Sequence, residues 1–202
     1  MEKYDLKDFI EKFVIPDMHK MIEHELHFYA FAIICQGIEV LGSVYDQKDL
    51  GDYGASESRF DNAITKLFRD KRYKQKQKLF FSVLRGPLIH QLRPGKGLFI
   101  SSAKKDKIDL KNHLEKHAES GNVILVIEQF LADFVEAFKK LNRELAIRKD
   151  LDNVKVEEPF IYVSSISPPY ATKWWDDQKQ SVLTVTPSVT GKWEDYPRAS
   201  TD

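Results

Sequence analysis

Hydrophobic residues recur at intervals of three and four along the chain up to about residue 150, a spacing that predicts amphipathic helices. The first of these helices is predicted over residues 5–14. Pro16 suits the first turn of a helix but not its interior, so we predict a break there and a second helix over about 17–44. A later stripe of hydrophobic residues predicts a long helix from Asn122, as its N-cap, to about residue 145.

The predicted second helix is hydrophobic on nearly all sides between Phe28 and Ile34, so we expect it to lie at the centre of the fold. Gly37 and Gly42 interrupt it with residues of low helix propensity, which indicates a close approach by a neighbouring helix. Together the helical segments predict a mostly α-helical bundle as a domain over residues 1–150.

Three runs of β-branched and aromatic residues favour strands: LFISS (98–102), FIYVSSI (160–166) and SVLTVT (181–186). The likeness of LFISS to IYVSS predicts one small sheet, in which 98–102 pairs with 160–166, with 181–186, or with both. Five prolines interrupt residues 151–202. We therefore expect this part to be a β-rich, irregular C-terminal arm, packed on the bundle or on a partner.

Charge is unevenly distributed along the chain. The 202 residues carry 31 basic and 31 acidic side chains, yet residues 59–107 hold 14 Lys and Arg against 3 Asp and Glu. A basic segment of this kind can attract a polyanion although the whole chain is neutral. The alternative is that acidic and basic segments neutralise one another in the fold.

Several classes of protein are disfavoured by composition. The one cysteine, Cys35, lies in a hydrophobic run, so we expect neither a disulfide framework nor a cysteine-based zinc site. No hydrophobic run reaches the roughly 18 residues that span a bilayer, and the first residues are charged rather than typical of a secretory signal. We expect a cytoplasmic protein that does not enter the membrane. The glycine motifs that bind nucleotide cofactors are missing, and no cofactor or metal is expected.

The segment RGPLIH places Arg85 and His90 five positions apart in the basic part of the chain. Arginine binds phosphate oxygens, and histidine gives or takes a proton near neutral pH. Together they could cleave RNA without a metal, because histidine can act on the 2′-hydroxyl or the leaving oxygen while arginine stabilises charge on the phosphorane. A straight helix would separate the two side chains by about 140°. Pro87 clashes with the carbonyl of Val83, however, so the helix should kink or restart between the pair.

An arginine and a histidine separated by four residues, after the hydrophobic lead-in FFSVL, resemble the motif of the HEPN superfamily. The resemblance covers about residues 17–145. It implies a helical bundle, often a homodimer that pairs two motifs across a cleft, and in many members a metal-independent endoribonuclease of toxin–antitoxin or defence systems. RNA and an antitoxin-like protein are the partners it implies. Arg85 would bind phosphate and His90 would be the general acid or base, although Gly86 stands where the family usually has a polar residue.

Further residues are candidates to support this pair. Gln36 and Glu39 are polar positions on the hydrophobic second helix, and we expect them to contact Arg85. Tyr73 lies in the basic segment KRYKQKQK, which we predict to be a surface patch. The candidate contacts to the RNA backbone are Gln91, Arg93, Lys74 and Lys76.

Two alternatives stand beside these expectations. Arg85 and Glu39 can form an ion pair that fixes the register of two helices, and the chain is then a non-catalytic helical interaction module. His113 and His117, on a short helix predicted from Asp109, have the spacing of two metal ligands, but no third ligand is evident. We expect those two histidines to be exposed or partly buried.

Overall fold

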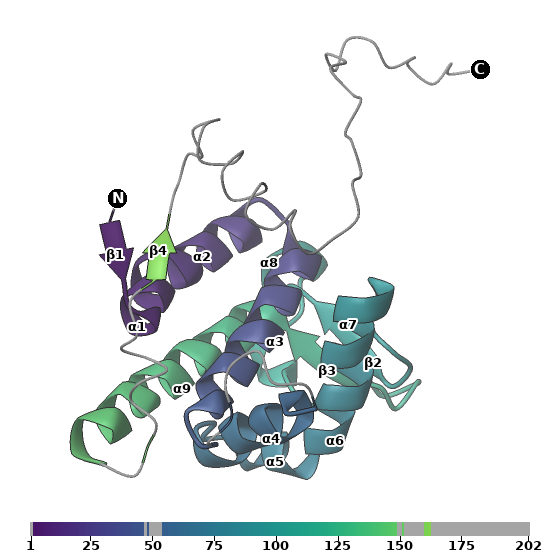
Figure 1. The fold of residues 1–202 in the computed structure, drawn as a ribbon. Helices are drawn as coiled ribbons and strands as arrows, with labels where there is room; N and C mark the ends of the chain where they lie inside the picture. Colours follow the sequence, from purple (N-terminus) through teal and green to yellow (C-terminus); the bar gives the residue numbers. More distant parts are fainter. Residues whose placement is uncertain (1, 47, 49–53, 149–150, 152–159, 163–202) are drawn as a thin grey trace, which may run out of the picture. The chain divides into compact units, whose positions relative to one another are not determined.

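The computed structural model describes residues 2–46, 48, 54–148, 151 and 160–162 (Figure 1). A compact unit spans Glu2–Tyr162. Helices predominate in it and the β-structure is small, which confirms the predicted fold class. Within the described ranges, no helix is both long enough and apolar enough to cross a bilayer.

The N-terminal helix continues through the proline at which a break was predicted. Helix α1 (Leu6–Phe9) leads into a π-helical segment, η1 (Ile10–Val14), and then into α2 (Ile15–Glu23). Pro16 is the second residue after η1, in the first turn of α2. The wider π-helical turn accommodates a residue that has no N–H to donate to the preceding turn, so the chain stays helical.

The predicted second helix is in fact two helices. Helix α2 ends at Glu23 and α3 spans His27–Ser43. Between them Glu25 has a positive φ of 60°, and the N–H groups of Glu25 and Leu26 bond to the carbonyls of Ile22 and Met21 at 3.1 and 2.7 Å. This pair of bonds is the Schellman arrangement, in which glycine usually takes the left-handed position.

Helix α3 lies at the centre of the unit, as predicted, and packs against α2, α4 (Ser56–Lys66) and α9 (Ile127–Ile147) (Figure 1). Its glycines make the expected close contacts. A Cβ on Gly37 would lie 2.7 Å from the ring of Phe134 on α9, and one on Gly42 would lie 1.7 Å from the carbonyl oxygen of Arg59 on α4. At Gly42 the two helix backbones therefore touch.

The strand formed by LFISS pairs with a different strand from the predicted ones. Strand β2 (Leu98–Ser101) pairs in parallel with β3 (Val123–Val126), whereas β4 (Phe160–Tyr162) pairs antiparallel with β1 (Glu2–Tyr4). Residues 163–166 and 181–186 lie outside the described residues. Four successive hydrophobic residues form β3, and all are buried, which a strand covered on both faces allows and one face of a helix does not.

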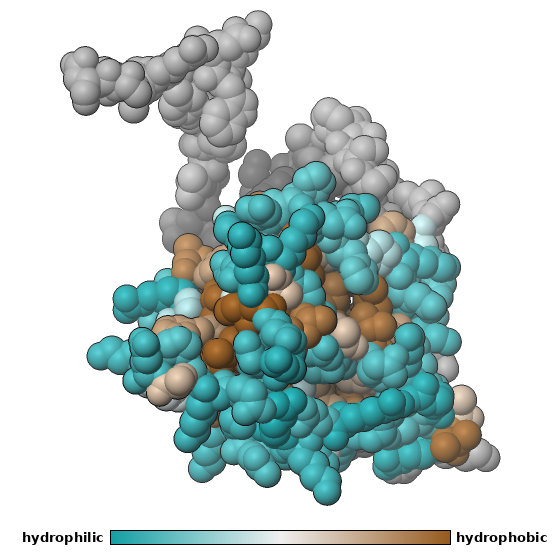
Figure 2. Space-filling model, turned by 180° about the vertical axis from the view of Figure 1, so that it is seen from behind, coloured by the Kyte–Doolittle hydropathy of each residue, from teal (hydrophilic) through white to brown (hydrophobic). Residues whose placement is uncertain are grey.

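The remaining short elements connect α4 to β2 and β2 to β3. Helix α9 begins after β3 rather than at Asn122, and the helix predicted from Asp109 is only the short 3-10 turn η3. The bounds of the remaining elements are α5 (Lys71–Gln75), α6 (Gln77–Leu79), π-helical η2 (Phe80–Arg85), α7 (Gly86–Gln91), α8 (Ala103–Asp106) and η3 (Leu110–Asn112). On the face seen in Figure 2, hydrophobic residues gather in a hollow surrounded by hydrophilic ones.

The contact at Gly42 leads to a prediction about stability. Gly42→Ala should destabilise the protein by about 3 kcal/mol or more, because the added methyl group meets backbone that cannot rotate away. Gln36→Ala is the matched control. Gln36 lies on the same helix but is exposed, and alanine has the higher helix propensity, so the melting temperature should hold or rise. Equal melting temperatures for the two variants in thermal denaturation would contradict the close packing of α3 on α4.

Candidate functional site

The break around Pro87 is a change from π-helix to α-helix. Arg85 is the last residue of η2 and the N-cap of α7, and the N–H of Gly86 bonds to Phe81 O in the π-helical manner. Because Pro87 has no N–H, it cannot bond to the carbonyl of Val83. Gly95 supplies that hydrogen bond instead, with an N–O distance of 2.7 Å. The loop after α7 is thus folded back onto the position that the proline leaves open.

The structure brings Arg85 and His90 together. Arg85 Nη1 lies 3.4 Å from His90 Nε2, although a straight helix would separate residues at this spacing by about 140°. The arginine side chain is long enough to cross that separation along the helix surface. His90 is exposed to solvent, so a ligand can reach it.

Glu39 of α3 holds the other side of the Arg85 guanidinium group. Its Oε2 accepts hydrogen bonds from Arg85 Nη2 at 2.6 Å and Nε at 3.0 Å. The two side chains are only 12% and 15% exposed, and the guanidinium group lies over the ring of Phe81 with a distance of 5.6 Å to its centroid. These contacts with Glu39 and Phe81 fix Arg85 in place, with Nη1 directed to His90.

Burial raises the pKa of the nearby Cys35 thiol, which keeps it protonated.

This arrangement has one clear chemical use. The guanidinium N–H groups of Nη1 and the imidazole Nε2 of His90 lie close enough for one phosphate oxygen to meet both. Glu39 neutralises the charge of Arg85, so attraction of a polyanion to this place depends on the other cations of the basic segment.

The other residues predicted for this site do not join the cluster. Gln36 is exposed, and among the described residues it has no hydrogen bond to Arg85. Gln91 and Arg93 are exposed at the end of α7. Lys74 is exposed on α5, and Lys76, its C-cap residue, is half-buried. Among the described residues, none of these four forms a hydrogen bond or an ion pair with Arg85 or His90.

The prediction that the segment KRYKQKQK is a surface patch is wrong for Tyr73, which is completely buried. Its hydroxyl group lies 2.8 Å from His113 Nε2 and donates to Asp133 Oδ2 at 2.7 Å. The N–H of Val126 donates to His113 Nδ1 at 3.0 Å, so the proton of the neutral ring is on Nε2 and is donated to Tyr73. The sequence gives no signal for this chain of hydrogen bonds, because its members come from α5, the segment after η3, β3 and α9.

The surroundings of this buried chain change the pKa of its members. Burial lowers the pKa of His113 to about 4 and raises the pKa of Asp133. Asp133 also accepts from Gln129 at 2.9 Å, beside a cavity of about 310 Å³ that Asp70 and Arg72 help to line. The expectation that both histidines are exposed or partly buried is wrong for His113, which is 2% exposed, whereas His117 is partly buried. The two do not share a helix, so they lack the predicted geometry of a metal pair. Within the described residues, no group of three or more His, Cys, Asp or Glu is arranged to hold a metal ion.

Comparisons with protein-family models, with curated proteins and with solved structures give no match to this chain. The resemblance to the HEPN superfamily therefore stays a prediction that rests on the residues themselves.

The ion pair leads to a prediction that a double-mutant cycle can check. Arg85→Met should lower the free energy of unfolding by about 2–4 kcal/mol, because the mostly buried carboxylate of Glu39 loses its partner. Glu39→Leu should have a similar cost. The double variant should recover most of the loss, since two hydrophobic side chains can pack where the ions were. Additive losses in urea denaturation would show that the pair contributes no coupling.

The buried histidine predicts how stability depends on pH. The unfolded chain takes up a proton on His113 near its ordinary pKa of 6.5, whereas the folded chain does so only near 4. Above about pH 6.5 His113 is neutral in both states and the free energy of unfolding does not depend on it. As the pH is lowered toward 4, the free energy of unfolding falls by about 3 kcal/mol in total, because only the unfolded chain takes up the proton. Asp133, with its raised pKa, opposes part of this loss at the acidic end.

His113→Gln isolates that contribution. Glutamine can accept from Val126 and donate to Tyr73 without titrating. Denaturation between pH 4.5 and pH 7 should show a steeper loss of stability for the wild type than for the variant. Parallel curves would mean that His113 titrates normally.

Proposed function

We propose that this protein is a metal-independent endoribonuclease of the HEPN-like type, with Arg85 and His90 as its catalytic residues. The observation that carries the proposal is the 3.4 Å approach of Arg85 Nη1 to His90 Nε2, with the histidine exposed. The basic segment on which the pair lies supports RNA as the substrate.

The proposed reaction is an internal transesterification. His90 takes the proton of a 2′-hydroxyl group, whose oxygen attacks the adjacent phosphorus while the bond to the 5′-oxygen breaks. Arg85 Nη1 donates to a phosphate oxygen and stabilises the charge that builds on it. Glu39 is a positioning residue, because it fixes the guanidinium group. The products are a 2′,3′-cyclic phosphate and a 5′-hydroxyl group, which receives a proton from a second acid.

A homodimer would supply that acid from the second copy's histidine. In this proposal the protein acts in the cytoplasm, and an antitoxin-like protein is the partner that would restrain it. Gln91, Arg93, Lys74 and Lys76 would contact the backbone of the RNA on either side of the cleaved bond.

The second candidate function is a non-catalytic interaction module. It is favoured by the 2.6 Å bond between Arg85 and Glu39, because a guanidinium group bound to a buried carboxylate also serves to fix α3 against η2. Under this alternative, His90 is an exposed residue without a catalytic task.

RNA cleavage separates the two candidates. Purified wild type should cleave a mixed RNA pool in the presence of EDTA and leave 2′,3′-cyclic phosphates. His90→Ala should lower the rate by about 100-fold or more without changing the melting temperature, since His90 is exposed. His24→Ala, at another exposed histidine, is the control and should retain full activity. Absence of cleavage by folded wild type would favour the interaction module.

A further inference from the structure

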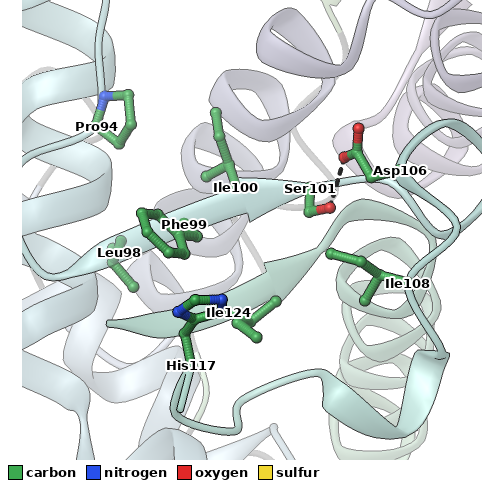
Figure 3. Close-up of a pocket in the computed structure, with 9 residues that line it drawn as sticks. All are labelled: Pro94, Leu98, Phe99, Ile100, Ser101, Asp106, Ile108, His117 and Ile124. Carbon is green, nitrogen blue, oxygen red and sulfur yellow. Dashed lines mark hydrogen bonds between the residues drawn. The ribbon is translucent and has the colours of Figure 1, made fainter. Parts of the chain in front are cut away.

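A second pocket lies on the sheet formed by β2 and β3 (Figure 3). Its volume of about 400 Å³ is within the range of small-molecule sites, about 300–1,000 Å³. The floor and sides are hydrophobic, and Phe99 is 40% exposed although its neighbours in β2 are largely covered. The hydrophobic residues of β2, β3 and the following loop that line it are Leu98, Phe99, Ile100, Ile108 and Ile124.

A hydrogen-bond acceptor lies at one end of this pocket. Asp106 Oδ2 accepts from Ser101 Oγ at 2.5 Å and from the N–H of Ser102 at 2.9 Å. These bonds lower the pKa of Asp106, so its carboxylate is charged at neutral pH. Among the described residues, no hydrogen bond reaches Asp106 Oδ1, which leaves that oxygen able to accept from a ligand.

A hydrogen-bond donor lies beside Phe99. The ring of His117 packs edge-on against the ring of Phe99, with 5.3 Å between centroids (Figure 3). His117 Nδ1 accepts from the N–H of Ser120 at 3.4 Å. In the neutral ring the proton is therefore on Nε2, which has no partner within the part of the chain that the structure describes.

Three basic residues are sequence neighbours of residues that line the pocket. Arg93, Lys107 and Lys116 are exposed, and each is adjacent in sequence to a residue that lines the pocket. None of the three forms an ion pair with another described residue. Of the acidic residues near them in the sequence, Asp106 lies inside the pocket and Asp109 pairs with Lys111. A ligand that carries its negative charge outside the pocket would thus be attracted by the three cations.

We propose that this pocket binds one nucleobase of an RNA strand. A base offers a flat face to Phe99, N–H groups to Asp106 and ring or carbonyl acceptors to His117, and its phosphates meet the cations outside. The inference rests on the proposed function, since it gives the substrate a second point of attachment. Pro94, which lines the pocket, is four residues after His90 in the sequence, so the proposal places the bound base on the same RNA strand as the cleaved bond.

The test measures binding without cleavage. Fluorescence anisotropy would compare the full chain's affinity for a 2′-O-methylated RNA octamer, which cannot be cleaved, with its affinity for an abasic strand of equal length. The wild type should prefer the base-bearing strand by about tenfold. Phe99→Ala should abolish that preference, and Phe99→Tyr, which keeps the ring, should retain it. Tyr29→Ala is the matched control, because Tyr29 is an aromatic residue with 58% exposure that does not line the pocket.

Each outcome decides the inference separately from the proposed ribonuclease activity. If wild type and Phe99→Ala prefer the base-bearing strand equally, or if the abasic strand binds as tightly, the pocket is not a base site even where RNA is cleaved. If the preference depends on Phe99 in a protein that cleaves no RNA, the base site stands and the proposed reaction falls. An unchanged melting temperature for Phe99→Ala ensures that the comparison is made on folded protein.

Discussion

The packing of α3 against α2, α4, α9 and η2 is the constraint on which the rest of this unit depends. A helix with neighbours on several faces has little room for side chains, so glycine is required where α4 approaches. The Glu39 side chain on this helix is only 15% exposed, so its charge needs a partner within the fold. Arg85 is that partner, and the direction in which its remaining N–H groups point follows from this pairing.

The helical content could be predicted from the sequence because it depends on local periodicity, but the boundaries that depend on rarer backbone geometry could not. Glu25 takes a left-handed conformation that normally signals itself through glycine. The run VILV is consistent with a buried strand or the start of a helix, and only its pairing with β2 decides between them. Pro16 suggested a break because a π-helical turn leaves no mark in the pattern of hydrophobic residues.

In the candidate site, too, contacts that depend on local sequence could be predicted, and contacts between residues far apart in the sequence could not. Arg85 and His90 are five residues apart, and Glu39 is a charged residue on a hydrophobic helix, so the cluster could be predicted from local sequence. Tyr73 meets His113 and Asp133 across 40 and 60 residues. Nothing in a basic segment indicates that its tyrosine is turned inward, because that orientation is set by the aromatic rings of other elements.

The hydrogen bond from Gly95 to Val83 joins the two places where an RNA strand is proposed to bind. The carbonyl of Val83 is available only because Pro87 cannot use it, and Gly95 lies in the short connection between the Arg85–His90 helix and β2. A ligand that ordered this connection would therefore also favour the hydrogen bond to Val83, next to the change from π-helix to α-helix at Gly86. If RNA binding at one of the two proposed places orders this connection in that way, thermodynamic linkage would make the effect reciprocal, and binding at either place would raise the affinity of the other by the same factor.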